Sequence, residues 1–313
     1  MRIGLVVDSA CDLPTSFLKQ HDITILPISV RIDDALQVDY RDEAATLAFL
    51  HSHIAERGAN AETTPFTVEQ IRDLFLQRLV IDYDYVFCMT ITKTRSPIFD
   101  NAQKASFAIL NEYRPVRAAA GNHTPFALRV IDTQTLFCAQ GIIAVEAVRL
   151  RDAGEGAAKI RARLEYLALH THGYLIPRDL YYIRTRARMK GDRSVSLFSA
   201  ALGTALDIKP VLHGARGETA PVAKIKGFEP AVQKMLDFAA RRVEAGLLTP
   251  TLTLCYGGEL DELRALPGYA PLRETCAAHN IEVFESVMSL TGMVNVGKGA
   301  VVVGFAAEPH RFE

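Results

Sequence analysis

Short runs of apolar residues, rich in β-branched side chains, alternate along the first half of the chain with longer stretches of helical spacing. Each run is apolar throughout rather than at every second position, which is typical of strands covered on both faces of a parallel sheet. We therefore predict an α/β fold with crossover helices between the strands. The predicted strands are residues 3–7, 23–30, 85–91 and 128–131, and the predicted helices lie near 42–56, 67–80, 97–112 and 139–151.

The second half has a more mixed pattern. Apolar runs at 208–213 and 221–225, separated by a glycine-containing turn, predict a β-hairpin. The charged helical stretch 151–170 opens at a glycine-containing break, and we place the boundary there between an N-terminal α/β lobe (1–155) and a mixed C-terminal α/β lobe (156–313). Further predicted elements are strands at 251–256, 281–286 and 300–305, and helices at 228–245, 259–267 and 271–279.

The bulk composition narrows the class of protein. Of the 313 residues, 49% are hydrophobic and 23% are charged, as in ordinary globular proteins with a substantial core. The formal net charge of -1 argues against a nucleic-acid-binding surface, because such surfaces need an excess of basic residues.

The sequence also predicts the compartment. The apolar run at 3–7 is too short for the core of a signal peptide, and no window is long enough to span a bilayer. The five cysteines are scattered and form no CxxC motif. We therefore expect buried, reduced thiols in a cytoplasmic protein without stable membrane insertion.

Sequence motifs of common catalytic sites are missing. Residues 8–12, after the first strand, lack the glycines of a dinucleotide-binding loop. Segment 292–299 resembles a P-loop but ends in Gly299, where a serine or threonine would hold magnesium. The HxH pairs at 51–53 and 170–172 would point their rings to different faces of a helix. We therefore predict no catalytic residue, no metal site and no cofactor.

Hydroxyl-bearing residues gather where predicted strands end and helices begin. Ligands of open α/β sheets lie at such strand ends, and the N-terminal amides of helices favour anions. The same residue types also cap helices, which explains any one of them alone. Together they favour a site for a small anionic group. These residues are Ser9, Thr63, Thr64, Thr67 and the segments 92–96 and 133–135.

The order of these segments resembles the DegV family along essentially the whole chain. The most specific matches are residues 6–14, which read V-V-D-S-A-C-D-L-P, and residues 206–212, which read L-D-I-K-P-V-L. The resemblance implies a two-lobed α/β protein that holds one long-chain fatty acid between its lobes. Looser matches are residues 26–30, 39–40, 63–67, 91–102, 130–133, 180–188 and 297–300.

The resemblance also implies roles for individual residues. By matching position, Thr63 and Ser96 would hydrogen-bond the carboxylate, and Arg188 would supply positive charge. The N-terminal lobe would then hold the carboxylate, and an apolar tunnel in the C-terminal lobe would hold the acyl chain. In relatives that serve a fatty-acid kinase, the carboxylate is presented to that separate kinase subunit. Secondary candidates for the carboxylate site are Ser9, Thr64 and Asn295.

Several positions depart from the family's pattern. Two glycines that precede the family's arginine are replaced by Arg186 and Ala187. A Ser-Gly-Thr segment becomes residues 96–98, which read Ser-Pro-Ile. Asn295 stands where the family has a histidine, and Asn cannot shuttle protons. Use of a kinase partner therefore stays open.

Two alternatives stand beside the lipid-binding hypothesis. One is an enzyme that acts on a small carboxylate or phosphate at the strand-end turns, with Asp8, Ser9 and Arg188 as participants. The other is a divergent member of the family that no longer binds lipid. A long-chain ligand that stays bound through purification would favour the lipid-binding protein, and a shallow polar cleft with titratable groups would favour the enzyme. Bulky side chains that fill the tunnel would favour the divergent member.

Overall fold

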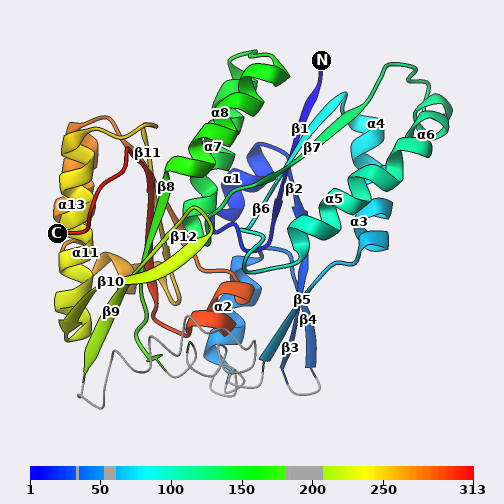
Figure 1. Ribbon diagram of the computed structural model, residues 1–313. Coiled ribbons are helices and arrows are strands. Elements are labelled where there is room, and N and C mark those ends of the chain that lie inside the picture. The colour runs from blue at the N-terminus through cyan, green and yellow to red at the C-terminus, as the bar shows by residue number, and fades with distance from the viewer. Residues whose placement is uncertain (33–34, 53–60, 181–182, 184–206) are drawn as a thin grey trace.

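The computed structural model describes the whole chain except residues 33–34, 53–60, 181–182 and 184–206 (Figure 1). Its first sheet contains four strands, β1 (Ile3–Asp8), β2 (Ile23–Leu26), β6 (Tyr85–Thr90) and β7 (Ala127–Asp132). All four are parallel, in the order β2-β1-β6-β7. This confirms the parallel sheet predicted from the continuous apolar runs.

A second sheet shows that the prediction of one strand over residues 23–30 is wrong. The chain leaves the first sheet at Pro27, and β3 (Ile28–Ile32) pairs in an antiparallel sheet with β4 (Ala35–Asp39) and β5 (Ala61–Pro65). Proline has no N–H to donate to a strand ladder. The N–H of Ile28 then donates to the Ser9 hydroxyl, 2.8 Å away, instead of continuing the pairing of β2.

Six strands from the second half form a mixed sheet on the opposite side of the molecule (Figure 1). Their order is β10-β9-β8-β13-β11-β12, so the last strand of the chain lies inside the sheet. The predicted hairpin is confirmed as β9 and β10. The strands are β8 (Thr171–Ile176), β9 (Ile208–Ala215), β10 (Glu218–Lys226), β11 (Thr251–Tyr256), β12 (Glu282–Val287) and β13 (Val301–Ala306).

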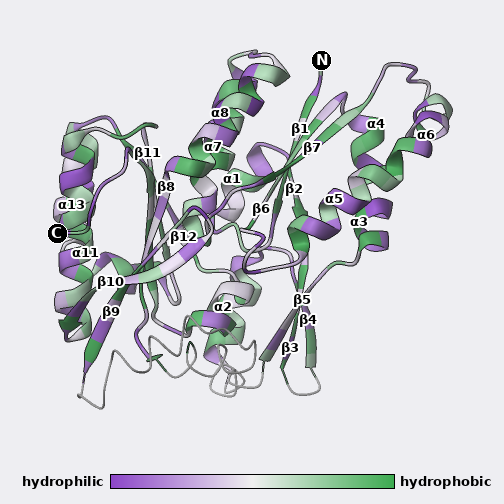
Figure 2. Cartoon of the chain, viewed as in Figure 1, coloured by the Kyte–Doolittle hydropathy of each residue, from purple (hydrophilic) through white to green (hydrophobic). Residues whose placement is uncertain are grey.

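Helices flank these sheets and place apolar side chains against them. Outer helices such as α11 (Phe228–Ala245) and α13 (Tyr269–Ala278) carry mixed hydrophobic and hydrophilic positions, which suits one buried and one solvated face (Figure 2). The other helices of the described residues are α1 (Thr15–Gln20), α2 (Glu43–His51), α3 (Val68–Leu74), α4 (Val80–Asp82), α5 (Ile98–Ala108), α6 (Tyr113–Ala119), α7 (Cys138–Asp152), α8 (Ala157–His170), α12 (Leu260–Arg264) and α14 (Leu290–Val296). A π-helical turn, Phe75–Leu79, joins α3 to α4, and a 3-10 turn, Ile109–Asn111, follows α5.

Helix α7 lies between the four-stranded sheet and the six-stranded sheet (Figure 1). Its residues 138–148 are all buried, as expected of a helix that is packed on every side. Glycines permit this closeness: a Cβ at Gly304 of β13 would lie 2.6 Å from the Ala139 Cα atom, and one at Gly141 would lie 2.7 Å from a Leu13 methyl carbon. The predicted lobe boundary falls just after α7 and stays a prediction, because α7 contacts strands of both sheets.

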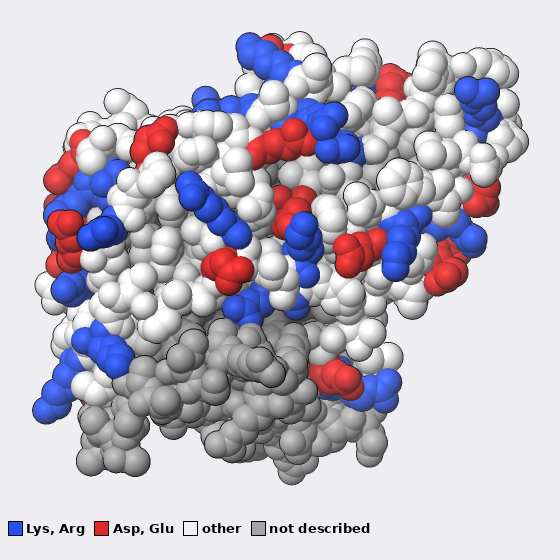
Figure 3. Space-filling model, in the orientation of Figure 1, with Lys and Arg blue, Asp and Glu red and all other residues white. Residues whose placement is uncertain are grey.

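Helix hydropathy and the charges on one face of the molecule can be compared with the sequence-based expectations. No described helix is both long and apolar enough to cross a bilayer. The face shown in Figure 3 mixes basic and acidic side chains rather than collecting one sign of charge.

Substitution of Gly304 tests the close approach of α7 to the six-stranded sheet. We expect Gly304→Ala to lower the free energy of unfolding by about 1–3 kcal/mol, because the new methyl group forces the helix away from the sheet. The matched control is Gly156→Ala, where a Cβ would meet no atom within 4 Å. Urea denaturation of both variants measures the difference; equal stabilities would contradict the packing described.

Candidate functional site

A cavity of about 230 Å³ lies between the N-terminal sheets and the six-stranded sheet. It exceeds an engineered apolar cavity of about 150 Å³ that binds benzene, so it has room for part of an organic ligand. Apolar side chains from both halves of the chain make up most of its wall. They include Ile28, Ile91, Phe137, Leu175, Leu212 and Val302.

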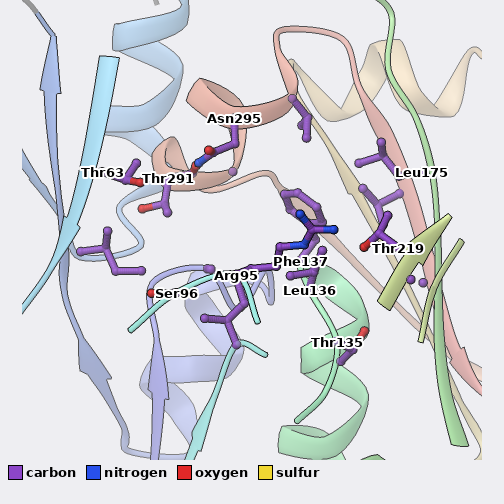
Figure 4. Close-up of a pocket in the computed structure, with 18 of the residues that line it drawn as sticks. Thr63, Arg95, Ser96, Thr135, Leu136, Phe137, Leu175, Thr219, Thr291 and Asn295 are labelled. Atoms are coloured by element: carbon purple, nitrogen blue, oxygen red, sulfur yellow. The ribbon is translucent and has the colours of Figure 1, made fainter. Parts of the chain in front are cut away.

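Polar side chains from separate segments line one side of this cavity (Figure 4). Thr63 comes from β5, Arg95 and Ser96 come from the turn between β6 and α5, and Asn295 comes from α14. From this side the Arg95 side chain extends into the cavity toward Phe137. Helix α5 begins directly after Pro97, which also lines the cavity, and its N-terminal amides add partial positive charge. This side of the cavity therefore suits an anionic group.

The structure brings three of the predicted site residues together and leaves others elsewhere. Thr63, Ser96 and Asn295 all line the cavity, although their binding roles stay predictions. Thr64 is exposed on the other face of β5, because side chains alternate along a strand. Arg188 lies outside the described residues.

Ser9 and Asp8 lie behind the cavity wall rather than in it. The Ser9 hydroxyl is fully buried and accepts the hydrogen bond from the Ile28 N–H described above. Asp8 is also fully buried, and neither side chain lines the cavity. Two of the three residues proposed for an enzyme, Asp8 and Ser9, therefore hydrogen-bond to the backbone behind the cavity wall. Within the described residues, no group of three or more histidine, cysteine or acidic side chains is placed to hold a metal ion.

Sequence reasoning placed Thr63 and Thr64 in a turn before a helix, and this is wrong. They lie within strand β5, which carries few apolar residues and therefore has no clear strand pattern. Sequence reasoning also missed Arg95, although this residue directly precedes Ser96 in segment 92–96, which was predicted to contribute to the anion site. Thr219 and Thr291, which line the cavity from β10 and α14, gave no sequence signal because neither follows a predicted strand.

Asp8 supports two turns that line the cavity. Its carboxylate accepts hydrogen bonds from the N–H groups of Ala10 (2.9 Å) and Ile91 (2.6 Å), both of which belong to cavity residues. The Gln140 side chain donates a third, at 3.4 Å. Burial raises the pKa of Asp8 from 3.8 to about 6, although these hydrogen bonds oppose the shift.

A buried ionic network, which we call the Arg41 network, joins the two halves of the chain next to the cavity. Only 1% of the Arg41 surface is exposed to solvent. Its guanidinium group donates hydrogen bonds to the carbonyl oxygens of Leu13 and Val287. The same group lies 3.2 Å from the Asp12 carboxylate. Burial raises the pKa of Asp12, and the charge of Arg41 opposes this rise. The Asp12 carboxylate also accepts from the N–H of Ser289, the residue that caps α14.

Asp39 completes the Arg41 network. One of its carboxylate oxygens accepts from both the N–H and the hydroxyl of Thr291 in α14, each at 2.8 Å. The other accepts from the N–H of Arg41 at 3.0 Å. The network therefore fixes α14, with Asn295 on it, against the N-terminal sheets.

Comparison with known proteins decides the family. The family model for the DegV family of uncharacterised proteins matches residues 2–308. The chain belongs to the DegV family. A DegV domain-containing protein of Xanthomonas axonopodis pv. citri is 68% identical over 312 residues, which cover 100% of this chain and 99% of that relative.

Solved structures confirm the DegV fold. A DegV lipid-binding protein from Thermotoga maritima superposes with a TM-score of 0.76 at 21% identity, covering 98% of each chain. A stearic-acid-binding protein from Eubacterium ventriosum gives a TM-score of 0.76 at 19% identity, covering 97% of this chain and 98% of its own. The predicted family and the predicted α/β fold class are thereby confirmed.

Substitution of Arg41 tests the network that joins the two halves of this DegV protein. We expect Arg41→Met to lower the free energy of unfolding by about 3–5 kcal/mol, because Asp12 then stays buried without its cation. Lys159→Ala, which breaks the solvent-exposed pair with Glu155, should cost no more than about 0.5 kcal/mol. Urea denaturation of both variants measures the contrast. A loss at Arg41 as small as that at Lys159 would be evidence against the network.

The pKa of Asp8 predicts how stability depends on pH. Because the pKa is higher in the folded than in the unfolded protein, ionisation of Asp8 opposes folding, and its contribution to stability is lost as the pH rises from about 4 to above 6. The stability of wild type relative to Asp8→Asn should therefore fall by on the order of 3 kcal/mol between pH 4 and pH 7. Denaturation across this range measures it. A constant difference would show that Asp8 titrates alike in both states.

Proposed function

We propose that this DegV protein binds a long-chain fatty acid in the cavity, with the carboxylate beside Thr63, Arg95 and Ser96. The observation that carries the proposal is a mostly apolar cavity whose hydroxyl groups and arginine are positioned for an anionic head group. A buried carboxylate is costly unless charged or hydrogen-bonding donors surround it, and these three residues supply such donors. Of the two structural relatives, one is a lipid-binding protein and the other a stearic-acid-binding protein, which supports the same ligand class.

The acyl chain supplies most of the affinity in this proposal. Each buried CH₂ contributes about 0.8 kcal/mol, so a chain of about 16 carbons contributes on the order of 12 kcal/mol before the costs of association. The apolar wall formed by β3, β8, β9, β13 and the turn before α7 would bury it. The enzyme alternative requires a polar cleft. The mostly apolar wall of this cavity favours a lipid ligand instead.

Arg95 takes over in this proposal part of the role first given to Arg188. It belongs to the same turn as Ser96, so the charge and the hydroxyl reach the carboxylate from one segment. Arg188 stays a second candidate from the C-terminal half.

Two finer proposals follow from the same function. The protein would act in the cytoplasm, where its five buried free cysteines stay reduced. It would present the carboxylate to a separate fatty-acid kinase, as relatives that serve such a kinase do. Asn295 would then contact the head group by hydrogen bonding alone, and its side chain already donates to the Thr291 carbonyl oxygen at 2.7 Å.

Adjacent threonines of β5 provide the test of the carboxylate site. We expect Thr63→Val to weaken binding of stearic acid about tenfold, because a hydrogen bond to a charged group is lost, and Arg95→Met to weaken it at least as much. Thr64→Val is the matched control, since Thr64 is exposed on the opposite face of the strand. Calorimetric titration of delipidated protein gives the dissociation constants.

Mass spectrometry of the purified protein, native and then denatured, completes this test. A stoichiometric mass that matches a fatty acid and leaves on denaturation would support the proposal. Absence of bound lipid, together with no uptake of added stearic acid, would refute it. Unchanged affinity in Thr63→Val would refute only the assignment of that residue.

A further inference from the structure

Part of the cavity wall, which we call the floor, is formed by two glycines, Gly173 and Gly214, and therefore has no side chains. Gly173 of β8 and Gly214 of β9 are paired in the sheet, and both line the cavity. A Cβ at Gly173 would lie 3.1 Å from that of Ala139 at the start of α7, so side chains larger than glycine are disfavoured there. The two glycines therefore contribute peptide backbone rather than side chains to the cavity wall, and the start of α7 packs directly against Gly173.

Thr135 places a buried hydroxyl beside this floor. The residue is 1% exposed and lines the cavity, and its hydroxyl oxygen has no hydrogen-bond partner among the described residues. That oxygen lies 3.8 Å from the Cβ position of Gly173. Thr133, two residues earlier, shows the usual arrangement, since its hydroxyl donates to the Thr90 carbonyl oxygen at 2.8 Å. A buried hydroxyl without a partner is costly, so its position at a cavity wall indicates that a ligand or a water molecule satisfies it.

A second hydroxyl borders the same floor from the hairpin. Thr219 of β10 pairs with Gly214, and its hydroxyl oxygen lies 3.9 Å from the Cβ position of that glycine. Thr135 and Thr219 lie apart from Thr63, Ser96 and Thr291 across the cavity (Figure 4). The cavity thus has hydroxyl groups on two sides, with the Arg95 side chain and apolar side chains such as Leu136 and Phe137 between them.

We propose that Thr135, Thr219 and the floor of Gly173 and Gly214 form a second polar subsite, which binds a hydroxyl group carried by the acyl chain of the ligand. This inference rests on the proposed function and narrows its ligand class to hydroxylated fatty acids. The carboxylate is held beside Thr63 and Arg95, and the hydroxyl of the chain exchanges a hydrogen bond with Thr135. A plain hydrocarbon chain at the floor would displace water and leave the Thr135 hydroxyl unsatisfied, whereas a hydroxyl group satisfies it.

The test compares stearic acid with monohydroxy derivatives that differ only in the position of the hydroxyl. Titrations of delipidated wild-type protein should show at least one isomer binding about fivefold more tightly than stearic acid, the effect of one net hydrogen bond. In Thr135→Val this preference should disappear, while stearic acid binds at least as well as to the wild type. Valine has nearly the shape of threonine, so the change removes little more than the hydroxyl.

Thr24→Val is the matched control. Thr24 of β2 is also buried with an unpartnered hydroxyl, but it does not line the cavity. This variant should keep the wild-type preference for the hydroxylated isomer. The melting temperature of ligand-free Thr135→Val, expected at or above that of the wild type, shows that the variant folds.

The outcomes separate this inference from the proposed function. If stearic acid binds but no hydroxylated isomer binds more tightly, the second subsite is refuted and fatty-acid binding stands. If Thr135→Val keeps the preference, a different group recognises the hydroxyl and the subsite is likewise refuted. If neither stearic acid nor any isomer binds, both the proposed function and the inference fall.

Discussion

The structure depends on a guanidinium group that is almost completely removed from water. Arg41 connects the loop after β1, through the Leu13 carbonyl oxygen and Asp12, to the end of β12, through the Val287 carbonyl oxygen. A buried cation is stable only where carbonyl oxygens and carboxylates replace its water, because its desolvation is costly. The two halves of the chain therefore have one favoured relative position rather than a range of them.

That single position explains why a cavity can persist between the sheets. Apolar surfaces that face each other across an open space would normally close, since collapse removes both from water. Here helix α14 is held by Asp12 and Asp39, and helix α7 is held by the glycine contacts at Gly141 and Gly304. Packing against these fixed helices keeps the apolar walls apart and leaves space that a ligand, rather than a side chain, fills.

Sequence reasoning succeeded where local pattern and tertiary structure agree. The parallel strands, the hairpin at β9 and β10 and helix α11 each carry a continuous or periodic apolar pattern, and they lie close to the predicted positions. The prediction failed at residues 23–30, where the apolar pattern continues across Pro27 but the backbone pairing does not. It also failed at β5, whose two threonines look like a polar turn until β3 is placed beside them.

The residues of the candidate site were also predictable only in part, because some of them are brought together by tertiary structure alone. Thr63, Ser96 and Asn295 were found by their resemblance to a family pattern, and the structure places all three at the cavity. Thr135 belongs to a segment that the sequence already indicated, but Gly173 of β8 and the hairpin residues Gly214 and Thr219 lie far from it in the chain, and no local spacing relates them to it. Their proximity arises from strand register and from the closeness of α7, which only the folded chain reveals.

The place of β13 in the six-stranded sheet has a consequence for biosynthesis. This strand is the last in the chain, yet it pairs with both β8 and β11 in the interior of the sheet and contributes Val302 to the cavity wall. During synthesis, β8 and β11 therefore lack the strand that pairs between them until residues 301–306 have left the ribosome. A chain that stops before residue 301 therefore has the other parts of the cavity wall without the strand that joins β8 to β11.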